Sequence, residues 1–365
     1  MRKRFLISFG ILSLFCLTTL VSCGKDPVVT DPDPIDTVVP PKDTVIIPPI
    51  DTLFVRTDSL ARGADVSWLT EMEQSGKKFY KNDSTQVECI RLLRSLGMNS
   101  IRLRVWVNPS DGWCNTADLL IKAKRASDLG MRILIDFHYS DSWADPSKQT
   151  KPAAWSALSF VNLRNAVTEH TTSVLTTLKN NGITPEWVQV GNETGDGMLW
   201  PDGKASVDMA NYAMLSNAGY NAVKAVFPNT KVMIHINNGW DNALFRWIFD
   251  GLKAQGAKWD VIGMSLYPTD TNWSSYNSLC LSNMNDMVSR YGSEVMLCEV
   301  GMDWRYADAC KLFLTDLIGK VKSVRNKKGL GVFYWEPECY GGWKNYGLGA
   351  FDSTGKPTVA LDAFK

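Results

Sequence analysis

The sequence predicts an α/β protein with a single (β/α)8 barrel, preceded by an export signal and an extended linker. Three observations lead to this fold class. Short runs rich in β-branched and aromatic residues alternate with helical patterns from residue 61 onward, which favours a parallel sheet. Eight such runs fit into roughly 300 residues, a size typical of these barrels. No Gly-x-Gly-x-x-Gly follows the first run, which argues against a dinucleotide-binding fold.

The first 22 residues have the pattern of a secretion signal. Basic residues precede an apolar run over residues 5–20, and small residues lead to Cys23. This ending, LVSC, resembles a bacterial lipobox, which implies cleavage before Cys23 and a lipid on that residue. The alternatives are an ordinary signal peptide or a membrane span, but a span normally runs longer and lacks a cysteine at its boundary. We expect export and a lipid anchor, in the outer membrane or at the cell surface, as the only membrane contact.

Residues 23–58 are predicted to be the lipidated cysteine and a linker rich in Pro, Asp and Thr. Seven prolines fall within residues 24–58, and no apolar periodicity appears until the end of the segment. Such a composition cannot bury a core and favours extended polyproline II. At about 3.1 Å per residue, the segment would hold the next domain up to roughly 90 Å from the anchor. Sheet formation by its Val and Ile pairs is the alternative. The barrel domain then spans residues 59–365.

The barrel elements follow in order. The predicted strands are residues 62–68, 100–107, 132–139, 187–191, 232–237, 261–267, 295–300 and 331–335. Helical patterns lie between them, at residues 86–96, 117–129, 162–180, 207–226, 243–255, 276–291 and 307–325. Several of these helices end at a glycine, as at Gly97, Gly130 and Gly182.

Polar residues stand where these strands end. The carboxyl ends of all strands in a parallel barrel meet on one face, so residues at those ends come together whatever their separation in the chain. The residues found there are Asp65, Arg102, Arg104, Asp136, His138, Asn192, Glu193, His235, Asn237, Tyr267, Glu299 and Trp335. Because polar groups are costly to bury, we interpret this set as a candidate site.

Composition limits the partners of that site. The 39 basic and 38 acidic side chains nearly cancel, so no basic field for nucleic acid is expected. Fourteen tryptophans are an excess, and those in predicted loops are suited to bind a ligand with a flat apolar face. The cysteines show no Cys-x-x-Cys spacing, which argues against a zinc site. We expect no cofactor and no metal.

Two of the rim residues suggest glycoside hydrolysis. This reaction needs one carboxylic acid to protonate the leaving oxygen and a second carboxylate near the anomeric carbon. Glu193 and Glu299 would face each other across the barrel mouth, about 5–5.5 Å apart in a retaining enzyme and about 6.5–9.5 Å apart in an inverting one. An adjacent cation, Arg102 or Arg104, would keep Glu299 ionised as the nucleophile.

The remaining rim residues have supporting roles in this hypothesis. A hydroxyl from Tyr267 would also favour the ionised nucleophile, and partial burial would keep Glu193 protonated. Asn192 would donate to a sugar 2-hydroxyl, and Trp335 would offer a flat surface to a sugar ring. Each residue taken singly also has a structural explanation: helix capping for the Asn-Glu pair, an ion pair for Glu299, or core packing for His138 and Trp335. Their shared position favours the functional interpretation.

Five motifs together carry a family resemblance: RGADVSW at 62–68, IRLRVWVNP at 101–109, LIDFHYSDSWADP at 134–146, VQVGNET at 188–194 and VFYWEP at 332–337. From about Arg62 to the C-terminus, the chain resembles glycoside hydrolase family 53, the endo-β-1,4-galactanases. The resemblance implies a retaining mechanism, with Glu193 as acid/base and Glu299 as nucleophile. It also implies cleavage within β-1,4-galactan, the side chain of pectin and type I arabinogalactan. Separately from the resemblance, we expect a monomer.

Two segments depart from the family. Some bacterial relatives carry an Asp-rich calcium loop after the seventh strand, whereas here GMDWRY at 301–306 passes almost directly into a helix, so we predict no such metal. The segment after the eighth strand, residues 338–346, is aromatic, and its Trp343 is a candidate sugar contact.

Two alternative functions share the same fold. Another retaining barrel glycanase, acting on β-mannan or β-glucan, would have both glutamates. A non-catalytic glycan-binding lipoprotein would not need either of them.

Overall fold

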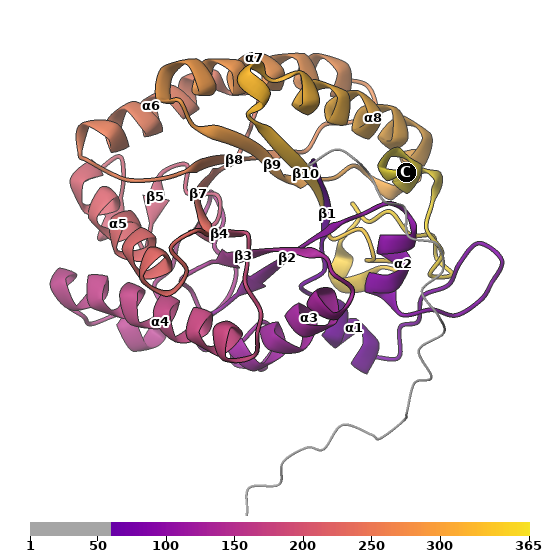
Figure 1. The fold of residues 1–365 in the computed structure, drawn as a ribbon, viewed down its shortest axis with the longest axis horizontal. Helices are drawn as coiled ribbons and strands as arrows, with labels where there is room; N and C mark the ends of the chain where they lie inside the picture. The colour runs from indigo at the N-terminus through magenta and orange to yellow at the C-terminus, as the bar shows by residue number, and fades with distance from the viewer. Residues whose placement is uncertain (1–59) are drawn as a thin grey trace, which may run out of the picture. The chain divides into compact units, whose positions relative to one another are not determined.

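Eight parallel strands form a closed barrel in residues 60–365, the part of the chain that the computed structural model describes. The export signal, Cys23 and the linker lie outside the described residues. Figure 1 shows the strands as a central ring, in the order β1-β2-β3-β4-β7-β8-β9-β10 and back to β1. Their bounds are β1 Ala61–Asp65, β2 Ser100–Val105, β3 Arg132–Phe137, β4 Trp187–Val190, β7 Lys231–Ile236, β8 Val261–Leu266, β9 Glu294–Val300 and β10 Gly329–Trp335.

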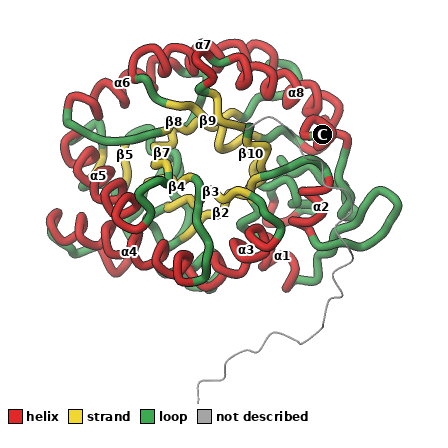
Figure 2. Tube along the Cα trace, in the orientation of Figure 1, coloured by secondary structure: helices red, strands yellow, loops and turns green. Residues whose placement is uncertain are grey.

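Helices surround this ring, as the red tube in Figure 2 shows. They are α1 Leu69–Gln74, α2 Cys89–Ser95, α3 Thr116–Asp128, α4 Phe160–Asn180, α5 Met209–Val226, α6 Asn242–Ala254, α7 Trp273–Tyr291 and α8 Ala307–Ser323. Side-chain caps define several of their starts: Asn115, Ser159 and Asp241 each accept a hydrogen bond from a backbone N–H in the first turn. The apolar faces of these helices pack on the outside of the strands in one large buried cluster.

A second, smaller cluster fills the barrel interior. It consists of Ala61, Leu134, Trp187, Met233, Val261, Met296, Cys298 and Phe333. A small residue makes room for a large neighbour here: a Cβ on Gly63 would lie 2.2 Å from the Phe333 ring, so glycine at this position accommodates that side chain. The interior below the mouth is therefore packed, and it supports the residues above it.

The predicted elements agree with the structure apart from their ends and some short pieces. Each predicted strand corresponds to one barrel strand, and the ends differ by a few residues. The predicted helix 86–96 begins only at Cys89, because the Glu88 side chain accepts from the Ile90 and Arg91 N–H groups and so caps the helix there. Helix α1 and the small hairpin of β5 (Gly197–Met198) and β6 (Gly203–Lys204) were not predicted. Both are too short to show a periodic pattern.

The cysteines and the helices bear on two of the sequence expectations. Within residues 60–365 the cysteines are buried and free, namely Cys89, Cys114, Cys280, Cys298, Cys310 and Cys339. None of the helices in this range combines the length and the apolar character needed to cross a membrane.

Candidate active site

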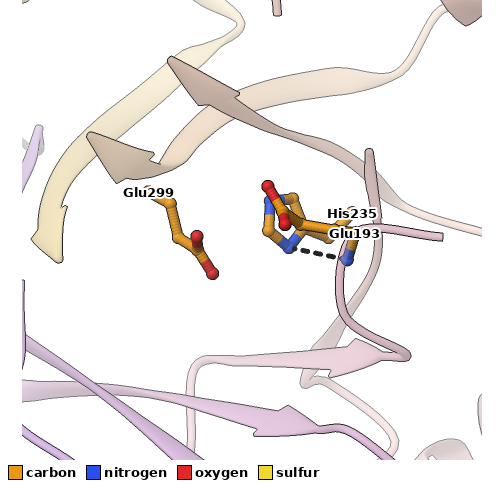
Figure 3. A group of neighbouring side chains, drawn as sticks. All are labelled: Glu193, His235 and Glu299. Atoms are coloured by element: carbon orange, nitrogen blue, oxygen red, sulfur yellow. Dashed lines mark hydrogen bonds between the residues drawn. The ribbon is translucent and has the colours of Figure 1, made fainter. Parts of the chain in front are cut away.

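Glu193 and Glu299 face one another across the mouth of the barrel (Figure 3). Glu193 follows β4, and Glu299 lies next to the end of β9. One carboxyl oxygen of Glu193 lies within 4.8 Å of one of Glu299. This spacing of the nearest oxygens is compatible with the about 5–5.5 Å between the carboxyl groups of retaining glycosidases.

A strained turn places Glu193 in the mouth. Gly191 has φ 89°, and a Cβ there would lie 2.6 Å from the Thr194 Cγ2 atom, so only glycine fits. Glu193 itself has φ 47°, an uncommon value for a side-chain-bearing residue. The turn is tied to β7, because the Glu193 N–H donates to His235 Nδ1 (3.3 Å) and the Thr194 N–H to the His235 carbonyl (2.8 Å). Strain of this kind persists where the surroundings over-determine it, commonly at active sites.

A cavity of about 280 Å³ contains both carboxyl groups. Its lining residues come from five of the eight barrel strands or the loops after them: His138, Trp143, Ala144, Asp145, Asn192, Glu193, Tyr267, Glu299, Trp335 and Leu348. The structure thus brings together six of the predicted site residues. Trp343 lies in a short 3-10 segment, Trp343–Asn345, and is not among these lining residues, so its contact with substrate stays a prediction.

Arg102 is the cation beside the nucleophile candidate. Its guanidinium is buried and lies 2.7 Å from Asp65, 2.9 Å from Asp136 and 2.8 Å from Glu299 Oε1. Its Nε donates to Gln189 Oε1 at 2.7 Å. One positive charge thus serves three carboxylates, which fixes the guanidinium from several sides.

Glu193 and Glu299, the two catalytic candidates, are coupled in their protonation. Burial raises the pKa of Glu193, and the Ser265 hydroxyl opposes this rise. Burial also raises the pKa of Glu299 to about 8, against the opposing charge of Arg102 and with a further contribution from Glu193. Two carboxyl groups this close titrate as a pair, so together they retain one proton near neutral pH.

The contacts decide where that proton resides. Both oxygens of Glu299 face donors, because Oε1 lies against Arg102 and Oε2 accepts from the Tyr267 hydroxyl at 3.0 Å. Glu193 accepts from Ser265 through Oε1 at 2.6 Å, while its Oε2 has no hydrogen-bond partner within residues 60–365. A proton on Glu193 Oε2 therefore breaks no contact, whereas one on Glu299 would meet a donor. This arrangement suits an acid at Glu193 and an ionised nucleophile at Glu299.

His138 holds the loop after β3 against this group. Its Nδ1 accepts from the Ala144 N–H (3.1 Å) and from Trp106 Nε1 (3.3 Å), so the ring proton is on Nε2, which donates to Asp136 at 2.9 Å. The loop carbonyl of Ala144 in turn accepts from Asn192 Nδ2 at 2.8 Å. The second N–H of that amide is left to donate to a ligand.

Arg104 is not the cation beside Glu299, which was one of the two possibilities from the sequence. It forms an ion pair with Glu336 rather than with Glu299. Its guanidinium carbon lies 4.3 Å from the ring centre of Trp143 and 5.0 Å from that of Trp68. Trp143 also contacts Trp335, with ring centres 5.7 Å apart. Arg104 therefore supports the aromatic wall of the cavity from behind.

Several residues with evident roles were missed among the sequence candidates, notably Gln189, Ser265, Trp143 and Glu336. A signal existed for two of them. Inward-facing residues of a strand are two apart, so Gln189 shares the face of Gly191, and Ser265 shares that of Tyr267. Trp143 lies in a loop, and no strand register predicts its direction.

Two groups of side chains in the described range have metal-ligand types close together: Glu193 with His235 and Glu299, and Glu336 with Glu338 and Cys339. In the first group, the contacts just described already account for Glu299 and for one oxygen of Glu193. The expectation of no metal stays a prediction.

Comparison with known proteins identifies similar chains. The model of the family described as glycosyl hydrolase family 53 matches residues 61–312. An arabinogalactan endo-beta-1,4-galactanase of Thermothelomyces thermophilus is 32% identical over 336 residues, covering 83% of this chain and 98% of that protein. Arabinogalactan endo-beta-1,4-galactanase A of Emericella nidulans is 35% identical over 316 residues, covering 79% of this chain and 87% of that protein.

A solved structure agrees with these matches. A chain from a study of two fungal beta-1,4-galactanases superposes with a TM-score of 0.78 at 30% identity, over 86% of this chain and 99% of that one.

Proposed function

This chain belongs to glycosyl hydrolase family 53, and from that premise we propose that it is a retaining endo-β-1,4-galactanase, cleaving internal linkages of β-1,4-galactan and type I arabinogalactan. The observation that carries the proposal is the carboxyl pair at the barrel mouth, with oxygens within 4.8 Å of each other. The named galactanases that this chain resembles support the substrate.

The pair performs the reaction in two displacements. In the first, a carboxylate oxygen of Glu299 bonds to the anomeric carbon, the bond from that carbon to the glycosidic oxygen breaks, and the proton of Glu193 passes to the departing oxygen. In the second, Glu193 takes a proton from water, the water oxygen bonds to the anomeric carbon, and Glu299 is released. The configuration at that carbon is inverted twice and so retained.

The neighbouring residues bind the sugar at the point of cleavage. Asn192 donates its free amide N–H to the 2-hydroxyl, an interaction that strengthens in the transition state. Trp335, at the end of β10, lines the cavity and presents an aromatic surface to the C–H face of a ring. Asp65, Arg102, Asp136 and His138 hold Glu299 and the loop after β3 in place without needing to reach the substrate.

The first products of a polysaccharide panel test this proposal. Incubated with linear β-1,4-galactan and followed by NMR, the protein should release short oligosaccharides whose new reducing ends appear first as the β anomer. Initial release of the α anomer would contradict the retaining mechanism. Release from β-mannan or β-glucan with none from galactan would reject the substrate, and galactan binding without hydrolysis would establish a non-catalytic binding protein.

We further propose that the protein acts as a monomer held to the outer membrane or cell surface by lipid on Cys23. The LVSC ending of the signal and the Pro-rich residues that follow it support this localisation. Cys23→Ala should move the protein from the membrane to the soluble fraction and leave galactan hydrolysis by the barrel intact. Variant protein that stays in the membrane fraction would contradict the anchor.

A further inference from the structure

A line of hydrogen bonds reaches Glu193 from the neighbouring strands β7 and β8. The Ser265 hydroxyl, on β8, donates to Glu193 Oε1 at 2.6 Å. The same hydroxyl lies 2.7 Å from Nε2 of His235, on β7. Both residues are buried, and Figure 3 shows the His235 ring beside the Glu193 side chain.

The contacts of His235 Nδ1 determine which atom donates in each of these hydrogen bonds. His235 Nδ1 faces the Glu193 N–H at 3.3 Å, and a backbone N–H can only donate. It also faces Gln189 Nε2 at 3.0 Å, and Gln189 is oriented by Arg102, which occupies its oxygen. Asn192 Oδ1 lies 3.0 Å from Nδ1 and accepts from Arg102, so Nδ1 faces two N–H donors and one acceptor that already has a donor. Nδ1 is therefore unprotonated.

The ring proton consequently lies on Nε2 and points at Ser265. Burial, and then the charge of Arg102, hold the pKa of His235 well below its usual range, so the ring is neutral. With its oxygen accepting from His235, the Ser265 hydroxyl has one direction left for its own proton, which is toward Glu193. Each bond in the line is thus oriented from His235 to Ser265 to Glu193.

We propose that Ser265 and His235 are positioning residues for acid/base catalysis: they keep Glu193 Oε1 as a permanent acceptor and so reserve Oε2 for proton transfer to and from the substrate. This inference rests on the proposed function, and it adds two residues that do not touch the substrate. Because a hydroxyl donor favours the charged form of a carboxyl group, Ser265 also stabilises the carboxylate that Glu193 becomes once it has given up its proton.

The charges around Glu193 make the Ser265 hydroxyl important for the ionisation of Glu193. Glu299 on β9, Asp136 on β3 and Asp145 in the loop after β3 are negative charges that oppose ionisation of Glu193, while Arg102 on β2 favours it. None of these groups donates a hydrogen bond to the Glu193 carboxyl. Within residues 60–365, the Ser265 hydroxyl is its single hydrogen-bond donor.

The experiment compares two buried serines. Ser265→Ala removes the donor, whereas Ser216→Ala removes a buried hydroxyl on α5 that has no hydrogen-bond partner in the described range. Because the alkaline limb of kcat/KM reports ionisation of the acid, it should move to higher pH in Ser265→Ala, by about one pH unit if the lost bond is a typical one to a charged group. Ser216→Ala should keep the wild-type profile.

Substitution of the histidine supplies the second comparison. His235→Gln retains an N–H that can reach Ser265, whereas His235→Leu leaves the serine hydroxyl free to turn away. We expect Leu to shift the alkaline limb in the same direction as Ser265→Ala and Gln to restore part of the wild-type value. A lower kcat in Ser265→Ala with an unshifted profile would show a merely structural role and overturn the proposal.

A titration without substrate separates this inference from the proposed function. In a Glu299→Gln background, Glu193 titrates alone, and ¹³C NMR of glutamate carboxyl groups reports its pKa, with Glu193→Gln giving the assignment. Adding Ser265→Ala should raise the pKa of Glu193 by about one unit. An unchanged pKa would overturn the positioning role proposed for Ser265 and His235. Failure of the wild type to cleave galactan would overturn the substrate assignment while leaving this titration valid.

Discussion

Arg102 and Arg104 stand two residues apart on β2, both are buried, and each forms an ion pair with a glutamate, yet their surroundings differ. Arg102 meets three carboxylates, and one of them, Glu299, opens to the cavity. Within residues 60–365, Glu336 is the one carboxylate that forms an ion pair with Arg104. Glu336 is completely buried, and its second oxygen accepts from the Trp68 N–H at 2.7 Å.

The comparison separates a reactive carboxylate from a structural one. Both glutamates have a guanidinium beside them, so the ion pair does not distinguish them. What distinguishes them is the space on the other side. Glu299 faces Glu193 across a cavity, whereas Glu336 accepts from the Trp68 N–H and lies beside the buried Glu338 and Cys339. The number of carboxylates that contact each arginine also differs. If one carboxylate is removed, the charge of Arg102 is still balanced by the other two, whereas Arg104 loses its ion-pair partner.

The largest expected effect is on catalysis. Glu299→Gln should lower kcat on β-1,4-galactan by a factor on the order of 10⁴ or more, because no covalent intermediate can form. Glu336→Gln, the matched change beside Arg104, should lower it by less than about ten-fold. Steady-state kinetics on both variants give the comparison. Equal losses would mean that Glu336 takes part in the chemistry and that the distinction between the two sites is wrong.

The second expected effect is on stability, and here Glu336→Gln should lose more than Glu299→Gln. Glu336→Gln leaves Arg104 as a buried charge, two of whose nitrogens already lack partners in the described range. Breaking such a pair costs about 3–5 kcal/mol of unfolding free energy. Glu299→Gln should cost much less, because Asp65 and Asp136 remain on Arg102. Urea unfolding of both variants measures this difference, and a more stable Glu336→Gln than Glu299→Gln would contradict it.

The sequence predicts the Arg102 site better than the Arg104 site, for a physical reason. Strand ends are visible as breaks in β-type runs, and the barrel brings those ends together, so Glu193, Glu299, Asn192 and Tyr267 could be placed on one rim without coordinates. Which arginine meets which glutamate depends on side-chain direction around a closed ring. Arg102 and Arg104 share one face of β2, and sequence spacing alone leaves both choices open.

The loops set a further limit on prediction from sequence. Trp143 completes the aromatic wall from the segment after β3, and its position depends on the His138 hydrogen bond to the Ala144 N–H. A contact of that kind has no periodic signature. Ser265 and His235 are an intermediate case, because their strand faces are predictable while the orientation of their hydrogen bonds is not.

The last expected effect is a dependence of stability on pH, and it concerns Glu338. This residue adds a second carboxyl group next to Glu336. Glu338 is fully buried, and its oxygens have no donor within residues 60–365. Burial, and then the charge of Glu336, raise the pKa of Glu338 well above its usual range, so it is a neutral acid in the folded protein.

The sign of its contribution to stability follows. In the unfolded chain a glutamate ionises above about pH 4.3. The neutral acid therefore stabilises the fold below that pH, and this contribution is lost as pH rises toward the folded-state pKa. Glu338→Gln, which stays neutral at every pH, should gain on the wild type by up to about 1.4 kcal/mol of unfolding free energy per pH unit above about pH 5. Urea unfolding between pH 5 and pH 8 measures this slope, with Glu169→Gln, an exposed change on α4, as the control. A difference independent of pH would mean that Glu338 is ionised in the fold, and that the Arg104 site, like the Arg102 site, holds more negative charges than its single guanidinium balances.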